Sequence, residues 1–259
     1  MRELEIANPQ KTVDLSVALE QAARGKSATG ADSAVFRQLA ASLEQAGWPP
    51  DAFDLADEPD RRTQRPFQAE AFAEAMAGAN LSDLPRLRRQ RSPAYGFAAG
   101  LLATPRLSPT LDFGQLPASD LEAAFGLADA LCELFRPVYA AVSFRDPDAA
   151  EPLPGRISSG RLVHRYGFEV VPPRCYVGAE LLDNFDLPAL RDLGVDVTPT
   201  DWGAVCLDAL KDPWAVPSAE LSAQLQRLGA YFAERGLMGD YSRALVKKAG
   251  ANWKPVQAT

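Results

Sequence analysis

The spacing of apolar residues predicts three strong amphipathic helices, over residues 33–46, 119–136 and 218–235. In each segment apolar residues recur every three or four positions, as on a helix face that packs against a core. Ser119 and Glu122 fit the capping box that begins a helix. The three apolar faces consist of Val35, Leu39 and Leu43, then Leu121, Phe125, Ala128 and Phe135, then Leu221, Leu225, Leu228 and Phe232.

Alternating apolar residues predict a group of strands. The segments are 95–101, 110–113, 138–144, 162–170, 175–181, 194–197 and 204–207. Weaker helices are predicted over 12–24, 67–77 and 186–194. Segments 48–66 and 146–160 are rich in proline together with charged residues or glycine, and are predicted as loops.

This order of elements predicts the fold class. Because the strands cluster and do not alternate strictly with helices, we expect an α+β protein with a mainly antiparallel sheet, covered by helices on one face. The charged, proline-rich segment 48–66 suggests a boundary. We therefore expect an N-terminal helical segment and loop over 1–66, and a main α+β domain over 67–259.

Negative charge is concentrated in one part of the chain. Residues 180–220 carry nine acidic and two basic side chains, a net charge of −7 that equals the charge of the whole protein. An acidic surface attracts basic partners and raises their rate of association. The calculated pI of 4.9 argues against nucleic acid as a partner.

Six residues in this block are the predicted partner-binding site: Asp196, Asp201, Trp202, Asp208, Asp212 and Trp214. The carboxylates would pair with lysine or arginine on a partner. The indoles would supply the large desolvated contacts typical of interface hot spots. A solvated acidic face, with the two tryptophans as lids over the core, is the alternative interpretation.

Motifs for catalysis, cofactors and metals are absent from the sequence. It has no HExxH, GxGxxG or GxSxG motif, and Gly25-Lys26-Ser27 lacks the preceding glycine of a P-loop. We expect no catalytic residues, no cofactor and no metal. The single histidine, His164, is expected to be a packed and hydrogen-bonded core residue, and the three cysteines to be buried, unreactive thiols.

The sequence also bears on the location of the protein and on its two arginine-rich runs. No apolar run approaches the roughly 20 residues that cross a bilayer, and the N-terminus does not look like a secretory signal, so we expect a cytoplasmic protein without membrane contact. The arginine-rich runs at 61–65 and 86–91 are expected to be solvated or paired within the chain. The oligomeric state stays open.

From residue 92 to residue 237 the element order resembles the α+β immunity proteins of bacterial polymorphic-toxin and type VI secretion systems. The elements concerned are paired strands around Ala94 and Thr110, the helix from Ser119, strands 138–144 and 162–171, and the closing helix from Ser218. The resemblance implies a cytoplasmic antidote that binds a cognate toxin and blocks its active site. Many such toxins are basic nucleases, which would suit the acidic block.

We therefore expect a non-enzymatic immunity protein that neutralises a basic protein toxin. A small hydrolase or transferase that uses a carboxylate pair is the first alternative, and a scaffold subunit of a larger bacterial assembly is the second. The hydrolase would need at least two converging carboxylates in a pocket, with perturbed pKa values. The scaffold would need an exposed apolar patch.

Overall fold

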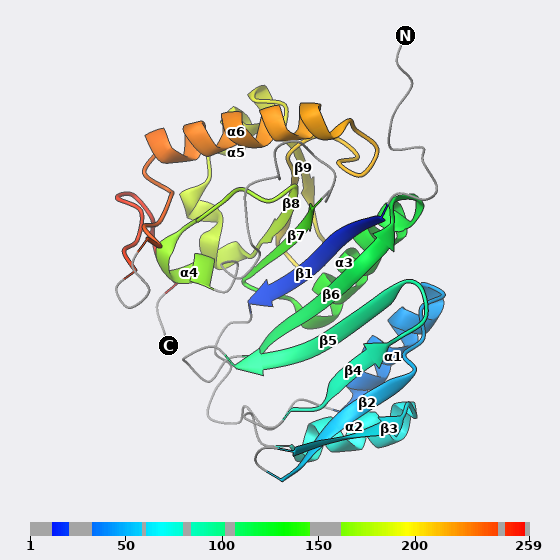
Figure 1. Ribbon diagram of the computed structural model, residues 1–259. Helices are drawn as coiled ribbons and strands as arrows, with labels where there is room; N and C mark the ends of the chain where they lie inside the picture. Colours follow the sequence, from blue (N-terminus) through cyan, green and yellow to red (C-terminus); the bar gives the residue numbers. More distant parts are fainter. Residues whose placement is uncertain are drawn as a thin grey trace.

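A computed structural model describes residues 12–20, 33–58, 61–79, 84–101, 107–145, 162–242 and 247–256 (Figure 1). Within these ranges all neighbouring strands of a ten-stranded sheet are antiparallel, in the order β3-β2-β4-β5-β6-β1-β7-β8-β10-β9. The strands are β1 (Thr12–Glu20), β2 (Ala52–Glu58), β3 (Arg61–Pro66), β4 (Arg86–Arg89), β5 (Ala94–Leu101), β6 (Leu107–Pro117), β7 (Tyr139–Arg145), β8 (Arg174–Val177), β9 (Asp196–Pro199) and β10 (Val205–Asp208). The helices are α1 (Ser33–Gln45), α2 (Ala69–Gly78), α3 (Leu121–Phe135), α4 (Val163–Tyr166), α5 (Leu187–Asp192) and α6 (Ser218–Glu234), with 3-10 turns η3 (Ala118–Asp120) and η5 (Ala179–Asn184).

Strand β1 lies inside the sheet, between β6 and β7, so the helix predicted over 12–24 is wrong in the part that is described. Leu15, Val17 and Leu19 alternate along it and are all buried. Residues two apart share one face of a strand. The apolar pattern thus has the two-residue period of a strand. The helix was predicted because Val13 and Val17 are four residues apart, a spacing that also fits a strand.

The segment predicted as a loop, 48–66, instead contains β2 and β3, which form one end of the sheet with β4. Strand β3 has no alternating apolar pattern because it is an edge strand whose described side chains are mostly exposed. The predicted boundary at residue 66 falls between β3 and α2, while strands from both sides of it share one sheet.

The arginine runs are largely paired within the chain, as expected. Arg88 binds the buried carboxylate of Asp54 at 2.6 Å, and Arg91 lies 3.0 Å from Asp51. The buried Arg89 donates to the backbone carbonyls of Pro49, Ser92 and Pro93, so it fixes the loop between β4 and β5.

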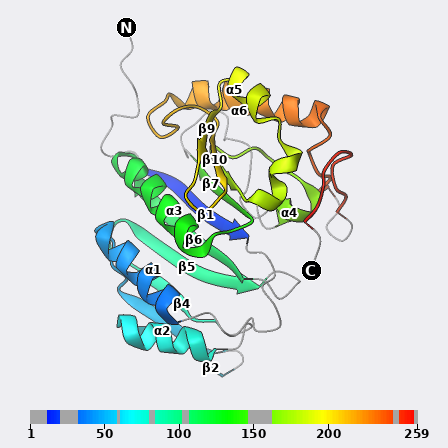
Figure 2. The same ribbon diagram turned by 180° about the vertical axis from the view of Figure 1, so that it is seen from behind.

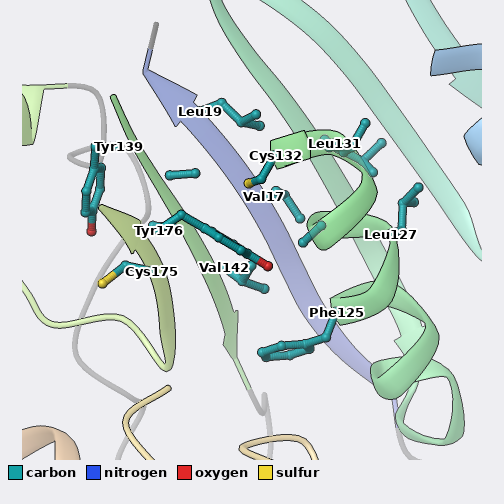
Figure 3. Close-up of a cluster of buried hydrophobic side chains, with 14 of the residues drawn as sticks. Val17, Leu19, Phe125, Leu127, Leu131, Cys132, Tyr139, Val142, Cys175 and Tyr176 are labelled. Carbon is teal, nitrogen blue, oxygen red and sulfur yellow. The ribbon is translucent and has the colours of Figure 1, made fainter. Parts of the chain in front are cut away.

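Helices α1, α2 and α3 lie together on one face of the sheet (Figure 2). Figure 3 shows α3 packed on the central strands, with Cys132 close to Val17 of β1. The Tyr176 and Val142 side chains point to the face of the sheet that α3 covers, whereas Tyr139 and Cys175 point away from α3. The α+β fold class and the antiparallel sheet predicted from the sequence are confirmed.

The other face is covered at one end by α6. Tyr139 contacts Phe168 at a ring distance of 5.8 Å, and Phe168 stacks on Phe232 of α6 at 5.0 Å. Trp253, near the end of the described chain, lies 5.9 Å from Phe168. This aromatic cluster joins α6 to the face of the sheet opposite α3. Helices therefore lie on both sides of the sheet at this end, whereas the sequence predicted them on one face only.

Several local predictions differ from the structure. The strand predicted over 162–170 is replaced by the single helical turn of α4, followed by a bridge between Phe168 and Met238. Ser119 donates to Asp120 and does not form the predicted capping box. Asp186, by contrast, caps α5 through the amide of Ala189, as predicted. No helix in the described ranges is long and apolar enough to cross a bilayer.

Candidate protein interface

The acidic block forms the sheet end opposite β3, together with the helices beside it. It runs from η5 through α5, β9 and β10 to the first turn of α6 (Figure 1). Strand β9 is the last strand of the sheet on this side in the described part of the chain. The charge that the sequence concentrates in one segment is therefore placed at one edge of the sheet.

A tight turn joins β9 to β10. Gly203 has a φ of +87°, which places it in the left-handed region. The hydroxyl of Thr200 accepts from the Ala204 amide, and the Thr200 amide donates to the Ala204 carbonyl at 2.9 Å. A glycine with positive φ after two turn residues is typical of a hairpin with a bulge. The turn leaves Asp201 exposed and Trp202 half-buried against the core.

Across the sheet, Asp196, Asp208 and Arg174 form one row of directly paired positions. Asp208 is opposite Arg174 of β8 and also opposite Asp196 of β9. Residues directly opposite each other in an antiparallel pair point to the same face. From the interior to the edge of the sheet, the row therefore consists of one cation, Arg174, followed by the carboxylates of Asp208 and Asp196.

Arg174 is the centre of a buried network. Its Nε and Nη2 atoms donate to the two oxygens of Asp208, each at 2.7 Å. Its Nη1 atom donates to Asp129 of α3 at 3.2 Å, and the Tyr176 hydroxyl donates to the same carboxylate at 2.5 Å. Asp129 is 57% exposed, while Arg174 and Asp208 are below 10%. One guanidinium therefore serves two carboxylates.

Two aromatic rings enclose the guanidinium. The Arg174 Cζ atom lies 5.0 Å from the centre of the Phe125 ring and 5.2 Å from that of Trp214. The two rings contact each other at 5.0 Å. Cation–π attraction is strongest where the cation is desolvated. Trp214 is thus partly a lid on this network, which was the alternative interpretation of its sequence position.

The network keeps an excess of negative charge. Burial raises the pKa of Asp208, and Asp129 and Asp196 raise it further, while Arg174 lowers it. Burial alone would lower the pKa of Arg174, but the hydrogen bonds to Asp208 raise it above its usual value. Arg174 therefore stays charged. A further cation beside these carboxylates would reduce their mutual repulsion.

The six predicted site residues are placed differently. Asp196, Asp201 and Asp212 are exposed, and Trp202 and Trp214 are half-buried. Asp208 is buried and both its oxygens bind Arg174, so it is not free to meet a partner. Asp208 acts within the chain, and the accessible carboxylates are its neighbours.

Sequence reasoning missed the two residues that organise this surface. Arg174 lies in an otherwise apolar strand, and Asp129 interrupts the apolar run of α3. A charged residue in a fully buried strand needs a partner. That was a usable signal for Arg174, but the identity of its partner depends on the pairing of β8 with β10.

A second buried pair joins Glu20 to His164. Both side chains are 2% exposed, and the His164 Nδ1 atom lies 2.5 Å from a Glu20 oxygen. The carboxylate also accepts from the backbone amides of Val163 and His164, so it caps the turn of α4. The prediction of a packed, hydrogen-bonded histidine is confirmed, although it lies on a helical turn and not on a strand.

The Glu20 pair gives a prediction on pH. Burial raises the pKa of Glu20 above its ordinary value of 4.5, against the lowering effect of His164. The folded protein then holds a proton that the unfolded chain has lost. We expect the free energy of unfolding, measured relative to Glu20→Gln, to fall as the pH rises from 4.5 through the raised pKa. Urea unfolding at several pH values measures this difference, with the exposed Glu133→Gln as control; a difference independent of pH would contradict it.

The thiols are buried, as predicted. Cys132, Cys175 and Cys206 are all free and buried, and burial raises the pKa of Cys206 to about 12. Within the described residues, no group of three or more histidine, cysteine, aspartate or glutamate side chains is placed to hold a metal ion.

Comparison with known proteins shows a likeness in structure but not in sequence. No family model matches the sequence, and no curated protein does. The structure resembles that of "Pseudomonas aeruginosa T6SS protein PA0821" with a TM-score of 0.52 and 14% identity, over 83% of this chain and 72% of the other. At this identity the likeness establishes a shared fold.

Proposed function

We propose that this chain is an immunity protein that binds a protein toxin of a bacterial type VI secretion system in the cytoplasm. The observation that carries the proposal is the exposed acidic edge around β9 and β10, held on a rigid sheet beside two half-buried indoles. The likeness to a protein described as a T6SS protein adds to it. The partner would be a basic protein whose active site this surface covers.

The acidic edge suits binding better than a carboxylate pair for catalysis. Asp208 and Asp196 are neighbours in the sheet, but both oxygens of Asp208 accept from Arg174. A catalytic carboxylate needs an oxygen within hydrogen-bond reach of a substrate. Exposed carboxylates on fixed backbone instead steer a cationic surface into register.

Neutralisation is tested by co-expression. A protein encoded beside this chain would be tested as the candidate toxin, by producing it in a bacterial host with and without this chain. We expect growth arrest by the toxin alone, rescue by the chain, and a stoichiometric complex on size-exclusion chromatography. Growth arrest that persists despite equal expression of this chain would contradict the proposal.

Charge reversal tests the surface. We expect Asp196→Lys with Asp201→Lys to weaken toxin binding by about 10- to 100-fold and to flatten its dependence on salt, because steering and pairing are both reversed. Titration calorimetry at two salt concentrations measures both effects.

A matched control for this variant lies on the other side of the molecule. Glu44→Lys with Glu74→Lys makes the same change in net charge at exposed positions of α1 and α2. It should leave the affinity within about threefold of wild type, because contacts at the interface are unchanged. Equal losses in both double variants would assign the effect to net charge alone.

A further inference from the structure

Among the described strands, none pairs with the outer edge of β9. In the antiparallel pair with β10, the amide of Thr200 donates to the carbonyl of Ala204. Hydrogen-bonded and non-hydrogen-bonded pairs alternate along such a ladder. The backbone groups of Asp196 and Thr198 therefore point toward β10, and those of Val197 and Pro199 point away from it.

This alternation leaves a short and selective edge. Pro199 has no amide hydrogen, so Val197 alone within β9 presents both an N–H and a C=O outward. Proline and charge on an edge strand oppose pairing with an arbitrary strand. An added strand must therefore offer something that compensates for the exposed charge of Asp196.

The side chains define what would compensate. Asp196 and Asp208 are directly opposite, and like charges in that relation destabilise a sheet. The next position in their row, on an added strand, would adjoin Asp196 on the face that carries Arg174. A lysine or arginine there would continue the row with an opposite charge.

On the face of the sheet that carries the Val197 side chain, an apolar residue would be complementary. The Val197 side chain belongs to the hydrophobic core, and α5 packs beside β9. An added strand would place its alternate side chains next to this apolar surface. The complementary segment thus alternates cationic with apolar residues.

We propose that the partner docks by strand addition: an extended segment that alternates cationic and apolar residues pairs with the outer edge of β9 at Val197. This rests on the proposed function and specifies how the same surface is used. Main-chain hydrogen bonds to Val197 would supply affinity, and a cation beside Asp196 would supply selectivity. The other edge strand, β3, is itself basic, so pairing between copies of this chain is the competing occupant.

The test uses the full chain and capped peptides as probes. Acetyl-TRVRT-amide is titrated into the labelled protein, with acetyl-TEVET-amide as the acidic control, and amide exchange is followed by NMR. We expect the arginine peptide to slow exchange of the Val197 amide about tenfold or more, and the glutamate peptide to leave it unchanged. Unchanged Val197 exchange at millimolar arginine peptide would overturn the inference.

Variants separate the backbone from the side chain. Val197→Pro removes the outward N–H at a position that makes no amide bond to β10, so the hairpin can still form. Val197→Ala shortens the same side chain and keeps the N–H. We expect Val197→Pro to abolish peptide binding, Val197→Ala to retain it within about threefold, and Asp196→Asn to weaken it about fivefold. Equal binding by the proline and alanine variants would overturn strand addition.

The two proposals fail in different ways. If the toxin is neutralised and binds the Val197→Pro and Val197→Ala variants equally, the docking mode is wrong and the proposed function stands. If no toxin is neutralised, the proposed function fails, and the peptide titration still decides whether β9 accepts a basic strand. The last experiment is sedimentation of the chain alone. Concentration-dependent self-association that Val197→Pro abolishes would show that β9 pairs with a second copy of this chain, and would overturn the inference.

Discussion

Replacing Arg174 by methionine is expected to lower the free energy of unfolding by about 3–5 kcal/mol, because it leaves a buried carboxylate without its cation. Both oxygens of Asp208 accept from Arg174 at 2.7 Å, and Asp208 is almost fully buried. Asp129 and Asp196 add negative charge nearby. Urea unfolding measures the loss, and the loss should shrink at low pH as protonation neutralises Asp208.

Two control variants test whether the loss comes from the unpaired carboxylate of Asp208. The double variant Arg174→Met with Asp208→Leu should recover most of the loss, since apolar side chains of similar size often replace a buried ion pair without cost. Arg235→Met removes an exposed arginine that lies 3.8 Å from Asp186, and should cost about 0.5 kcal/mol or less. A loss below about 1 kcal/mol for Arg174→Met would mean that the buried network does not form.

Replacing Phe168 by alanine is the second substitution with a large expected effect, about 3–5 kcal/mol of unfolding free energy. Phe168 is fully buried, stacks on Phe232 at 5.0 Å, and has the rings of Tyr139, Phe185 and Trp253 within 5.9 Å. Its removal leaves a cavity between the sheet and α6. Thermal and urea unfolding measure the loss.

The matched control for this cavity is Phe67→Ala. Phe67 is only half-buried and contacts Phe72 at 6.1 Å, so solvent can fill the space that its ring leaves. We expect a loss of about 1–2 kcal/mol there. Equal losses at both positions would show that the aromatic cluster around Phe168 adds nothing beyond ordinary burial.

These two sites explain how the sheet beneath the acidic edge can be held in a fixed shape. Arg174 ties β8 to β10 and α3 on one face of the sheet, and Phe168 ties the neighbouring strand β7 to α6 on the other. Rigid placement lowers the entropy lost when a partner binds. Asp196, Asp201 and Trp202 are thus presented on a hairpin that Arg174 anchors through Asp208 of β10.

Much of the helical structure follows from local pattern. The apolar spacing of α1, α3 and α6 is carried by residues within one segment, and all three helices lie where that spacing predicts. The concentration of carboxylates over 180–220 is likewise visible in the chain itself. The apolar spacing and the concentration of carboxylates each depend on residues within one segment, so both can be seen without knowing how distant segments pack.

Long-range pairing decided the elements that the pattern missed. Strand β1 finds its partners in β6 and β7, and β3 is held by backbone bonds to β2 without any apolar pattern of its own. Segment 162–170 alternates like a strand, yet its first turn is helical because Glu20 caps it from β1. No local signal predicts a cap that lies 143 residues away.

By itself, the amino-acid sequence determined the α+β class, the three main helices and the acidic character of one segment, since each depends on residues close together in the chain. Only the tertiary structure decided which carboxylates a partner can reach. Asp208 and Asp196 look alike in the sequence, but strand pairing places one beside Arg174 in the interior and the other at the edge of the sheet. Burial depends on neighbours in space, and these come from distant parts of the chain.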